Sequence, residues 1–182
     1  FISFLIILLI PIKSFALIEV DITRGNLNPL PLAVSPLSID EKSRKSFNEL
    51  LKKENIGLEI SLIVENNLRT TGLFNPLNKD AFLQAPDIAN LKPRFEDWNL
   101  IKAQALITGK VNFEDGKLRV EFRLWDILAG KEMMALAFTT VPDNWRRVGH
   151  IISDKVYERL TGEKGYFDTR IIYVAEEGPK TN

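Results

Sequence analysis

The chain has 182 residues, of which 45% are apolar and 26% are charged, and its 24 basic and 24 acidic residues give a formal net charge of zero. This composition is typical of a globular protein long enough to bury one core, and the balanced charge argues against a general polyanion binder, which usually carries a basic stripe. The lack of cysteine excludes a disulfide scaffold and a thiolate zinc site.

The first sixteen residues predict export. The apolar run over residues 1–12 is too short for a transmembrane helix of ~20 residues, and Ser14 and Ala16 occupy the small positions of a signal-peptidase site. Because the sequence does not start with Met, we expect the basic leader of this signal to be missing. We interpret residues 1–16 as a signal peptide and Leu17 as the mature start, with an N-terminal anchor helix as the alternative.

Two strands and a polar stretch are predicted next. Residues 17–23 (LIEVDIT) alternate apolar and polar side chains, as a half-buried strand does. Residues 30–34 form a second short apolar run, in which Pro31 hints at a sheet edge. The interleaved charges of residues 35–53 indicate a solvated loop or a loose helix rather than a nucleic-acid patch.

Residues 55–72 predict a long amphipathic helix that ends at Gly72, a candidate left-handed cap. Residues 73–77 suggest a short strand or turn. Residues 78–97 contain two prolines and predict a long, mostly irregular link, with one or two helical turns near residues 95–102. The apolar face of the long helix consists of Ile56, Ile60, Ile63, Val64 and Leu68.

A three-stranded meander and a last helix follow. Asp115-Gly116 is a strong hairpin signal between residues 103–113 and 117–127, because both turn residues tolerate a positive φ. A third strand is expected at residues 133–141, and then Asp143 is a plausible N-cap for a helix that Gly162 ends. On the middle strand Leu118, Val120, Phe122 and Leu124 should face the core, and on the helix Trp145, Val148, Ile152, Val156 and Leu160 should be buried.

The final segment, residues 169–176 (TRIIYVAE), reads as a strand that is apolar on both faces. Ile171, Tyr173 and Ala175 lie on one face, and Ile172 and Val174 on the other. Such a strand must be covered on both sides. Either the preceding domain covers one side, or the strand opens a second domain.

Three stretches of the sequence resemble the TolB family, the periplasmic component of the bacterial Tol-Pal system. They are residues 63–77 (IVENNLRTTGLFNPL), residues 107–111 (ITGKV) and residues 144–176 (NWRRVGHIISDKVYERLTGEKGYFDTRIIYVAE). The resemblance covers the whole chain, and its most specific part is the last stretch.

The resemblance implies an α/β domain, a mixed β-sheet with two main helices packed on it, over residues 17–166. It implies that residues 167–182 are the first strand of a truncated six-bladed β-propeller, whose neighbouring blades would cover both apolar faces. It further implies a non-enzymatic periplasmic adaptor that links inner-membrane TolA to outer-membrane Pal, for envelope integrity and outer-membrane constriction at division.

By resemblance, the segment after the signal peptide binds TolA. A freed alternating strand can pair its main chain with the edge of a partner's sheet, whereas the alternative is a plain structural edge strand. Pal would bind the absent propeller, and neither nucleic acid nor membrane insertion after cleavage is expected. The predicted TolA-binding residues are Leu17, Ile18, Glu19, Val20, Asp21, Ile22 and Thr23.

The last helix carries one polar stripe of interest. His150, the only histidine, has Arg146 four residues before it and Asp154 four residues after it, and Tyr157 continues the stripe. The stripe is either an interdomain docking face or a solvated surface with a weak His–Asp pair. We find no nucleophile elbow, phosphate loop, metal cluster or cofactor site; the alternative function is the non-catalytic front of a propeller-containing serine oligopeptidase.

Overall fold

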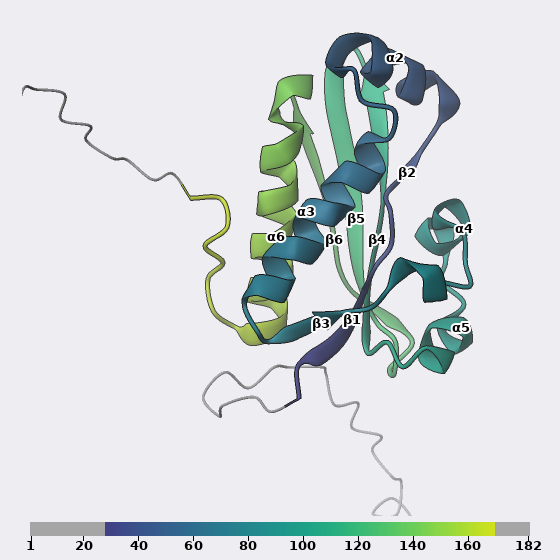
Figure 1. The fold of residues 1–182 in the computed structure, drawn as a ribbon, viewed down its shortest axis with the longest axis vertical. Coiled ribbons are helices and arrows are strands. Elements are labelled where there is room, and N and C mark those ends of the chain that lie inside the picture. Colours follow the sequence, from purple (N-terminus) through teal and green to yellow (C-terminus); the bar gives the residue numbers. More distant parts are fainter. Residues whose placement is uncertain (1–27, 170–182) are drawn as a thin grey trace, which may run out of the picture.

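The structure is a computed structural model that describes residues 28–169 (Figure 1). The predicted signal peptide and the strand predicted at residues 17–23 lie outside this range, as does the strand predicted at residues 169–176 apart from Thr169. Within it, no helix combines the length and the apolar character needed to cross a membrane.

A mixed β-sheet forms the centre of the domain, in the order β3-β1-β4-β5-β6, with β2 beside β4. Strand β1 runs parallel to both of its neighbours, whereas β4, β5 and β6 form an antiparallel meander. The strands are β1 Leu30–Val34, β2 Ser38–Ile39, β3 Phe74–Pro76, β4 Ala105–Glu114, β5 Lys117–Asp126 and β6 Lys131–Thr140.

Two long helices, α3 and α6, lie side by side across one face of the sheet (Figure 1). Together with the mixed sheet they confirm the predicted α/β class. The shorter helices α4 and α5 lie on the side of β1 and β4 away from α3. The helices are α2 Glu41–Leu51, α3 Ile56–Thr70, α4 Pro86–Leu91, α5 Phe95–Leu100 and α6 Trp145–Thr161, with 3₁₀ turns η2 Lys79–Ala81 and η3 Pro142–Asn144.

The main core fills the space between the sheet and the pair α3 and α6. Along β5 every second residue belongs to this core, as predicted. The predicted apolar faces of α3 and α6 also lie in it, apart from Ile63, which is only partly buried. The Asp115-Gly116 turn has φ values of 50° and 74°, the left-handed pair that a two-residue hairpin requires.

A smaller apolar cluster occupies the opposite face of the sheet. Trp125 points there because neighbouring strand residues face opposite sides, and its ring packs edge-on against Phe95 of α5. Trp98 of α5 lies at the centre of this cluster and is fully buried. Helices α4 and α5 therefore cover only one end of that face.

Strand β1 is not at the sheet edge, so the hint taken from Pro31 was wrong. The pairing of β1 with β4 begins at Leu32, which lies opposite Ala105. Pro31 precedes this pairing, so the N–H that proline lacks is not needed for a hydrogen bond between the two strands. Its carbonyl still accepts a hydrogen bond from Gln104 N–H at 3.0 Å.

Two polar stretches are more ordered than the sequence predicted. Residues 35–53 form β2 and the helix α2, whose N-cap is Asp40; this carboxylate accepts from Ser43 N–H at 2.7 Å, which lowers the pKa of Asp40 below its usual value. Phe47 anchors α2 by inserting its fully buried ring into the main core. Residues 78–97 contain η2 and α4 besides the start of the predicted α5.

Asp143 does not cap the last helix. It lies inside the 3₁₀ turn η3, and the N-cap position belongs to Asn144. The Asn144 side chain donates to Thr140 Oγ1 at 3.0 Å rather than capping the helix, so this bond ties the start of α6 to the end of β6. The helix ends at Gly162 as predicted, with φ at 76°.

The two long helices approach each other closely at Gly149 of α6. A Cβ atom there would lie 2.8 Å from Cγ2 of Ile63 and 3.0 Å from its Cβ. These atoms belong to a β-branched side chain with little rotamer freedom in a helix, so they cannot move aside cheaply. The spacing of α3 and α6 therefore requires glycine at this position.

We expect Gly149→Val to lower the free energy of unfolding by about 1–3 kcal/mol, because the new side chain overpacks the helix interface. Valine is a better helix former than glycine, so helix propensity alone predicts that the substitution raises the free energy of unfolding. Urea unfolding of this variant and of Lys155→Val, on the exposed side of α6, measures the effect. Equal midpoints for the two variants would show that the interface tolerates a side chain here.

Candidate functional site at the chain exit

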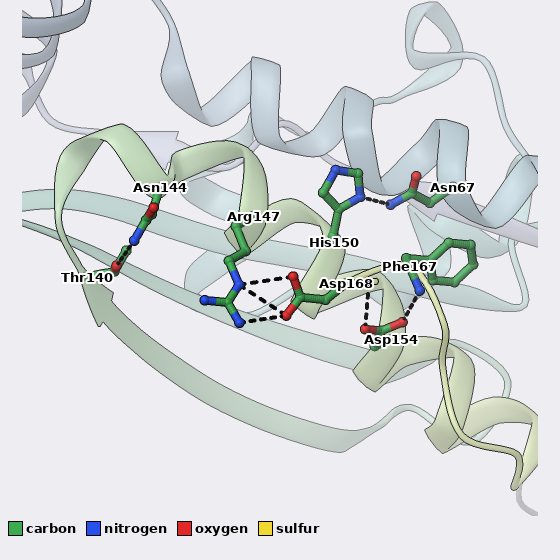
Figure 2. Close-up of polar contacts among 8 residues, drawn as sticks. All are labelled: Asn67, Thr140, Asn144, Arg147, His150, Asp154, Phe167 and Asp168. Carbon is green, nitrogen blue, oxygen red and sulfur yellow. Dashed lines mark hydrogen bonds and ion pairs between the residues drawn. The ribbon is translucent and has the colours of Figure 1, made fainter. Parts of the chain in front are cut away.

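After α6 the chain turns back and lies along the helix (Figures 1 and 2). The carboxylate of Asp154, in the middle of α6, accepts the backbone N–H of Phe167 at 2.7 Å and that of Asp168 at 3.0 Å. Hydrogen bonds to a charged acceptor are stronger than neutral ones. One carboxylate therefore fixes two consecutive residues of the exit segment, which we define as residues 165–168.

Arg147 holds the far end of the exit segment. Its guanidinium forms a bidentate ion pair with Asp168, with Nε 3.0 Å from Oδ1 and Nη2 3.0 Å from Oδ2 (Figure 2). The hydrogen bonds and charge of Asp168 raise the pKa of Arg147. Because Arg147 precedes Asp154 along α6, the two contacts set the direction of the exit segment back toward the start of the helix.

Gly165 allows the exit segment to come this close. A Cβ on Gly165 would lie 2.4 Å from Cα of Asp154, a backbone atom that cannot move away. Any side chain at this position would push the segment off the helix and break the two bonds to Asp154. The glycine is thus a steric requirement of the site.

Aromatic packing completes the attachment. The ring of Tyr157 packs edge-on against Tyr166, at 5.6 Å between centroids, and against Phe167 at 6.0 Å. On its other side it meets Phe74 of β3 at 6.3 Å. Burial, with added repulsion from Tyr166 and Glu163, raises the pKa of Tyr157. Tyr157 therefore belongs to the core and not to an open surface.

His150 contacts α3 rather than Asp154. Its Nδ1 lies 2.9 Å from the side-chain amide nitrogen of Asn67, which also donates to Ser153 Oγ at 3.0 Å (Figure 2). An amide nitrogen only donates, so Nδ1 is the acceptor in this contact. This polar group joins the two long helices beside the close approach at Gly149.

The predicted stripe is thus divided among three surroundings. His150 faces α3, Asp154 and Tyr157 face the exit segment, and Arg146 alone is exposed, stacked over the Trp145 ring at 4.2 Å.

Sequence reasoning missed Asn67, Arg147 and Asp168. Arg147 and Asp168 are 21 positions apart, so no helical spacing connects them. The sequence signal for this contact was the pair Gly162 and Gly165. The first glycine indicates that the chain reverses after the helix, and the second indicates that the backbone comes close to another segment.

The charged groups of the site hold the exit segment against α6. Within residues 28–169, no group of three or more His, Asp or Glu side chains is placed to hold a metal ion. The carboxylates of the site are committed to backbone N–H groups and to Arg147. What the arrangement does is fix the path by which the chain leaves the domain.

The predicted partner-binding residues 17–23 lie outside the described range. The described chain begins shortly before β1, where Leu30 N–H donates to Leu73 O at 2.9 Å. Strand β1 then has β3 on one side and β4 on the other. The sheet is therefore continuous around β1 within the part of the chain that the structure describes.

Comparison with known proteins gives a family match. The sequence model of the family described as the TolB amino-terminal domain matches residues 18–133 of this chain. The Tol-Pal system protein TolB of Pelagibacter ubique (strain HTCC1062) is 81% identical over 178 residues, which are 98% of this chain and 40% of that protein. The chain therefore spans less than half the length of this relative.

The fold also matches a solved structure. The crystal structure of TolB from Acinetobacter baumannii superposes with a TM-score of 0.61 at 20% sequence identity, covering 78% of this chain and 30% of that one. At this identity the match concerns the fold alone, and it agrees with the α/β architecture described above.

We expect Asp154→Ala to release the exit segment without unfolding the domain. Two hydrogen bonds to a carboxylate are lost, so the amide of Phe167 should exchange with solvent about tenfold faster or more. Hydrogen exchange read residue by residue measures this. The control is Lys155→Ala, which removes an exposed ion pair with Glu158 at 2.9 Å. Unchanged protection of Phe167 in the Asp154 variant would contradict the assignment.

Proposed function

This chain belongs to the TolB family, and from that membership we propose that it is the front part of a non-enzymatic periplasmic adaptor that links inner-membrane TolA to outer-membrane Pal. The observation that carries the proposal is the 81% identity, over 98% of this chain, to a Tol-Pal system protein. The adaptor would serve envelope integrity and outer-membrane constriction at cell division.

Export is the first part of the proposal. Residues 1–16 act as a signal peptide that is removed after Ala16, which leaves the domain in the periplasm. The sequence supports this through the apolar run and the small residues at Ser14 and Ala16.

TolA binding is assigned to residues 17–23. The segment has three apolar side chains on one face, and burying each contributes roughly 1.5–3 kcal/mol, while ordering seven residues costs about 1–2 kcal/mol each. The free energy gained by burying these side chains is close to the free energy lost by ordering the segment. Additional stabilisation therefore comes from main-chain hydrogen bonds to the edge of a partner's sheet. The domain does not need the segment, because residues 28–169 already form the sheet and the main core.

Pal binding is assigned to a β-propeller that follows this domain. The part of the predicted segment 167–182 that follows Asp168 would supply its first strand, because Phe167 and Asp168 are held on α6; this strand accounts for the two apolar faces of residues 171–175. The exit segment supports this assignment, because it fixes the path of the chain just before that strand. Of the predicted stripe, the exposed Arg146 and the half-buried His150 and Asp154 form the proposed docking face for the propeller, whereas Tyr157 is buried in the main core.

Deleting residues 17–24 from the mature protein should abolish TolA binding and leave the melting temperature of the domain nearly unchanged. The matched substitutions are Val20→Glu, on the apolar face of the segment, and Asp21→Ser, on the polar face. The first should weaken binding far more than the second, because only the apolar face fills pockets of the partner. Pull-down with TolA and thermal melting of the same samples test this.

Two results would count against the assignment. TolA binding that survives the deletion would remove the segment from the interface. A deletion that lowers the melting temperature strongly would show that the segment is a structural strand of the home sheet.

The docking face is tested in the full-length protein with His150→Ala and Asn67→Ala. Both variants remove the same contact between α3 and α6, but only the first alters the proposed docking face. We expect small-angle scattering to show a looser domain arrangement for His150→Ala only. Identical profiles for the two variants would limit His150 to its role within the domain.

A further inference from the structure

Five large apolar side chains are exposed around α4 and α5. Leu83, Ile88, Leu91 and Leu100 belong to the segment that builds these helices, and Leu128 belongs to the turn between β5 and β6. We call these five residues the apolar patch. Leu91 is 83% exposed and Leu100 is 74% exposed. Single exposed leucines are common on soluble proteins, whereas apolar side chains gathered in one region mark an interaction surface.

Contacts between the elements bring the parts of the patch together. The side chain of Gln84 donates to the carbonyl of Arg94 and to the carboxylate of Asp97, both at 2.9 Å, which ties the loop before α4 to the start of α5. The turn between β5 and β6 lies beside α5, since a Cβ on Gly130 would be 3.7 Å from Cδ2 of Phe95. The patch is therefore held on a fixed support.

The patch residues contribute little to the core. The cluster beneath α4 and α5 is built on Trp98, with partly buried neighbours such as Phe82, Phe95 and Ile101. In the described part of the chain, none of the five patch residues belongs to this cluster or to the main core. A polar residue at a patch position should therefore leave both clusters intact.

Lysines flank the two most exposed leucines. Lys92 directly follows Leu91, and Lys102 lies two residues after Leu100; both lysines are exposed. The acidic residues of α4 and α5 lie instead in the first turn of each helix, where the helix dipole favours negative charge. The C-terminal end of each helix therefore presents a leucine together with a positive charge.

We propose that the apolar patch and its two lysines bind the surface of a bilayer that contains anionic lipids. The leucine side chains would enter the boundary between headgroups and acyl chains, and the ammonium groups would remain among the phosphates. Within residues 28–169 no helix can cross a membrane, so the contact is confined to the bilayer surface.

The shape and charge of the patch favour a lipid surface over a protein partner. Leu91 and Leu100 are the last residues of α4 and α5, and at their exposure they protrude instead of lining a groove for a helix or strand. The lysines beside them complement the phosphates of anionic lipids.

The patch is also separate from the exit segment. Helices α4 and α5 lie on the side of the sheet away from α3 and α6, and α6 holds the exit segment (Figure 1). The proposal does not depend on TolA or Pal binding, so either can fail without the other.

Co-sedimentation of the mature protein with vesicles tests the proposal. The protein should sediment with vesicles made of equal parts of phosphatidylglycerol and phosphatidylcholine, and much less with vesicles of phosphatidylcholine alone. Added salt should weaken the binding because it screens the lysines. A protein that stays in the supernatant with both kinds of vesicle overturns the proposal.

The leucines are tested with a double variant. Leu91→Ser combined with Leu100→Ser should lower the affinity for the anionic vesicles about tenfold or more, because both side chains supply apolar area to the bilayer. The matched control is Leu50→Ser combined with Leu62→Ser, at exposed positions on α2 and α3, which should leave the affinity unchanged. Equal affinities of the two double variants overturn the assignment to the patch.

The lysines are tested with Lys102→Gly. Lys102 has a φ of 61°, a conformation that favours glycine, so the substitution removes the charge without straining the backbone. It should lower the affinity for the anionic vesicles about fivefold. The matched control is Lys52→Gly, with a φ of 54° at the end of α2, at the other end of the sheet (Figure 1). Equal losses in both variants overturn the role of Lys102.

Two further results would assign the surface differently. If the leucine double variant converts a dimer into a monomer in sedimentation equilibrium without vesicles, the patch is a contact between copies and the lipid proposal falls. If vesicle binding is lost on deletion of residues 17–24 but survives in the leucine double variant, the N-terminal segment binds the lipid, and the assignment to the patch is overturned.

Discussion

The close approach of α3 and α6 is the constraint on which the rest of this domain depends. Gly149 removes the side chain that would collide with Ile63, so both helices lie flat on one face of the sheet and bury their apolar stripes there. The polar group of Asn67 and His150 then closes the same interface with a hydrogen bond instead of leaving two polar side chains unsatisfied.

The position of α6 also determines how the chain leaves the domain. One face of the helix is buried in the main core, and a neighbouring face holds the exit segment through Asp154 and Arg147. The same helix is thus both a core element and the attachment of residues 165–168.

The two faces of the sheet are covered unequally, and this asymmetry separates stability from interaction. The main core lies on the side of α3 and α6, whereas α4 and α5 protect only the end around Trp98. Within residues 28–169 the rest of that face carries no helix, and β6 pairs with β5 only.

The sequence by itself determined the elements whose burial is periodic: the alternation along β5, the stripes of α3 and α6 apart from Ile63, and the Asp115-Gly116 hairpin are as predicted. These features are local, because the period of the backbone decides which side chains share a face. Tertiary structure alone decided that Pro31 lies inside the sheet, that His150 meets Asn67 and that Arg147 reaches Asp168. Each of these contacts joins segments that are distant in the sequence. A local sequence pattern therefore does not predict which residues become neighbours in the folded chain.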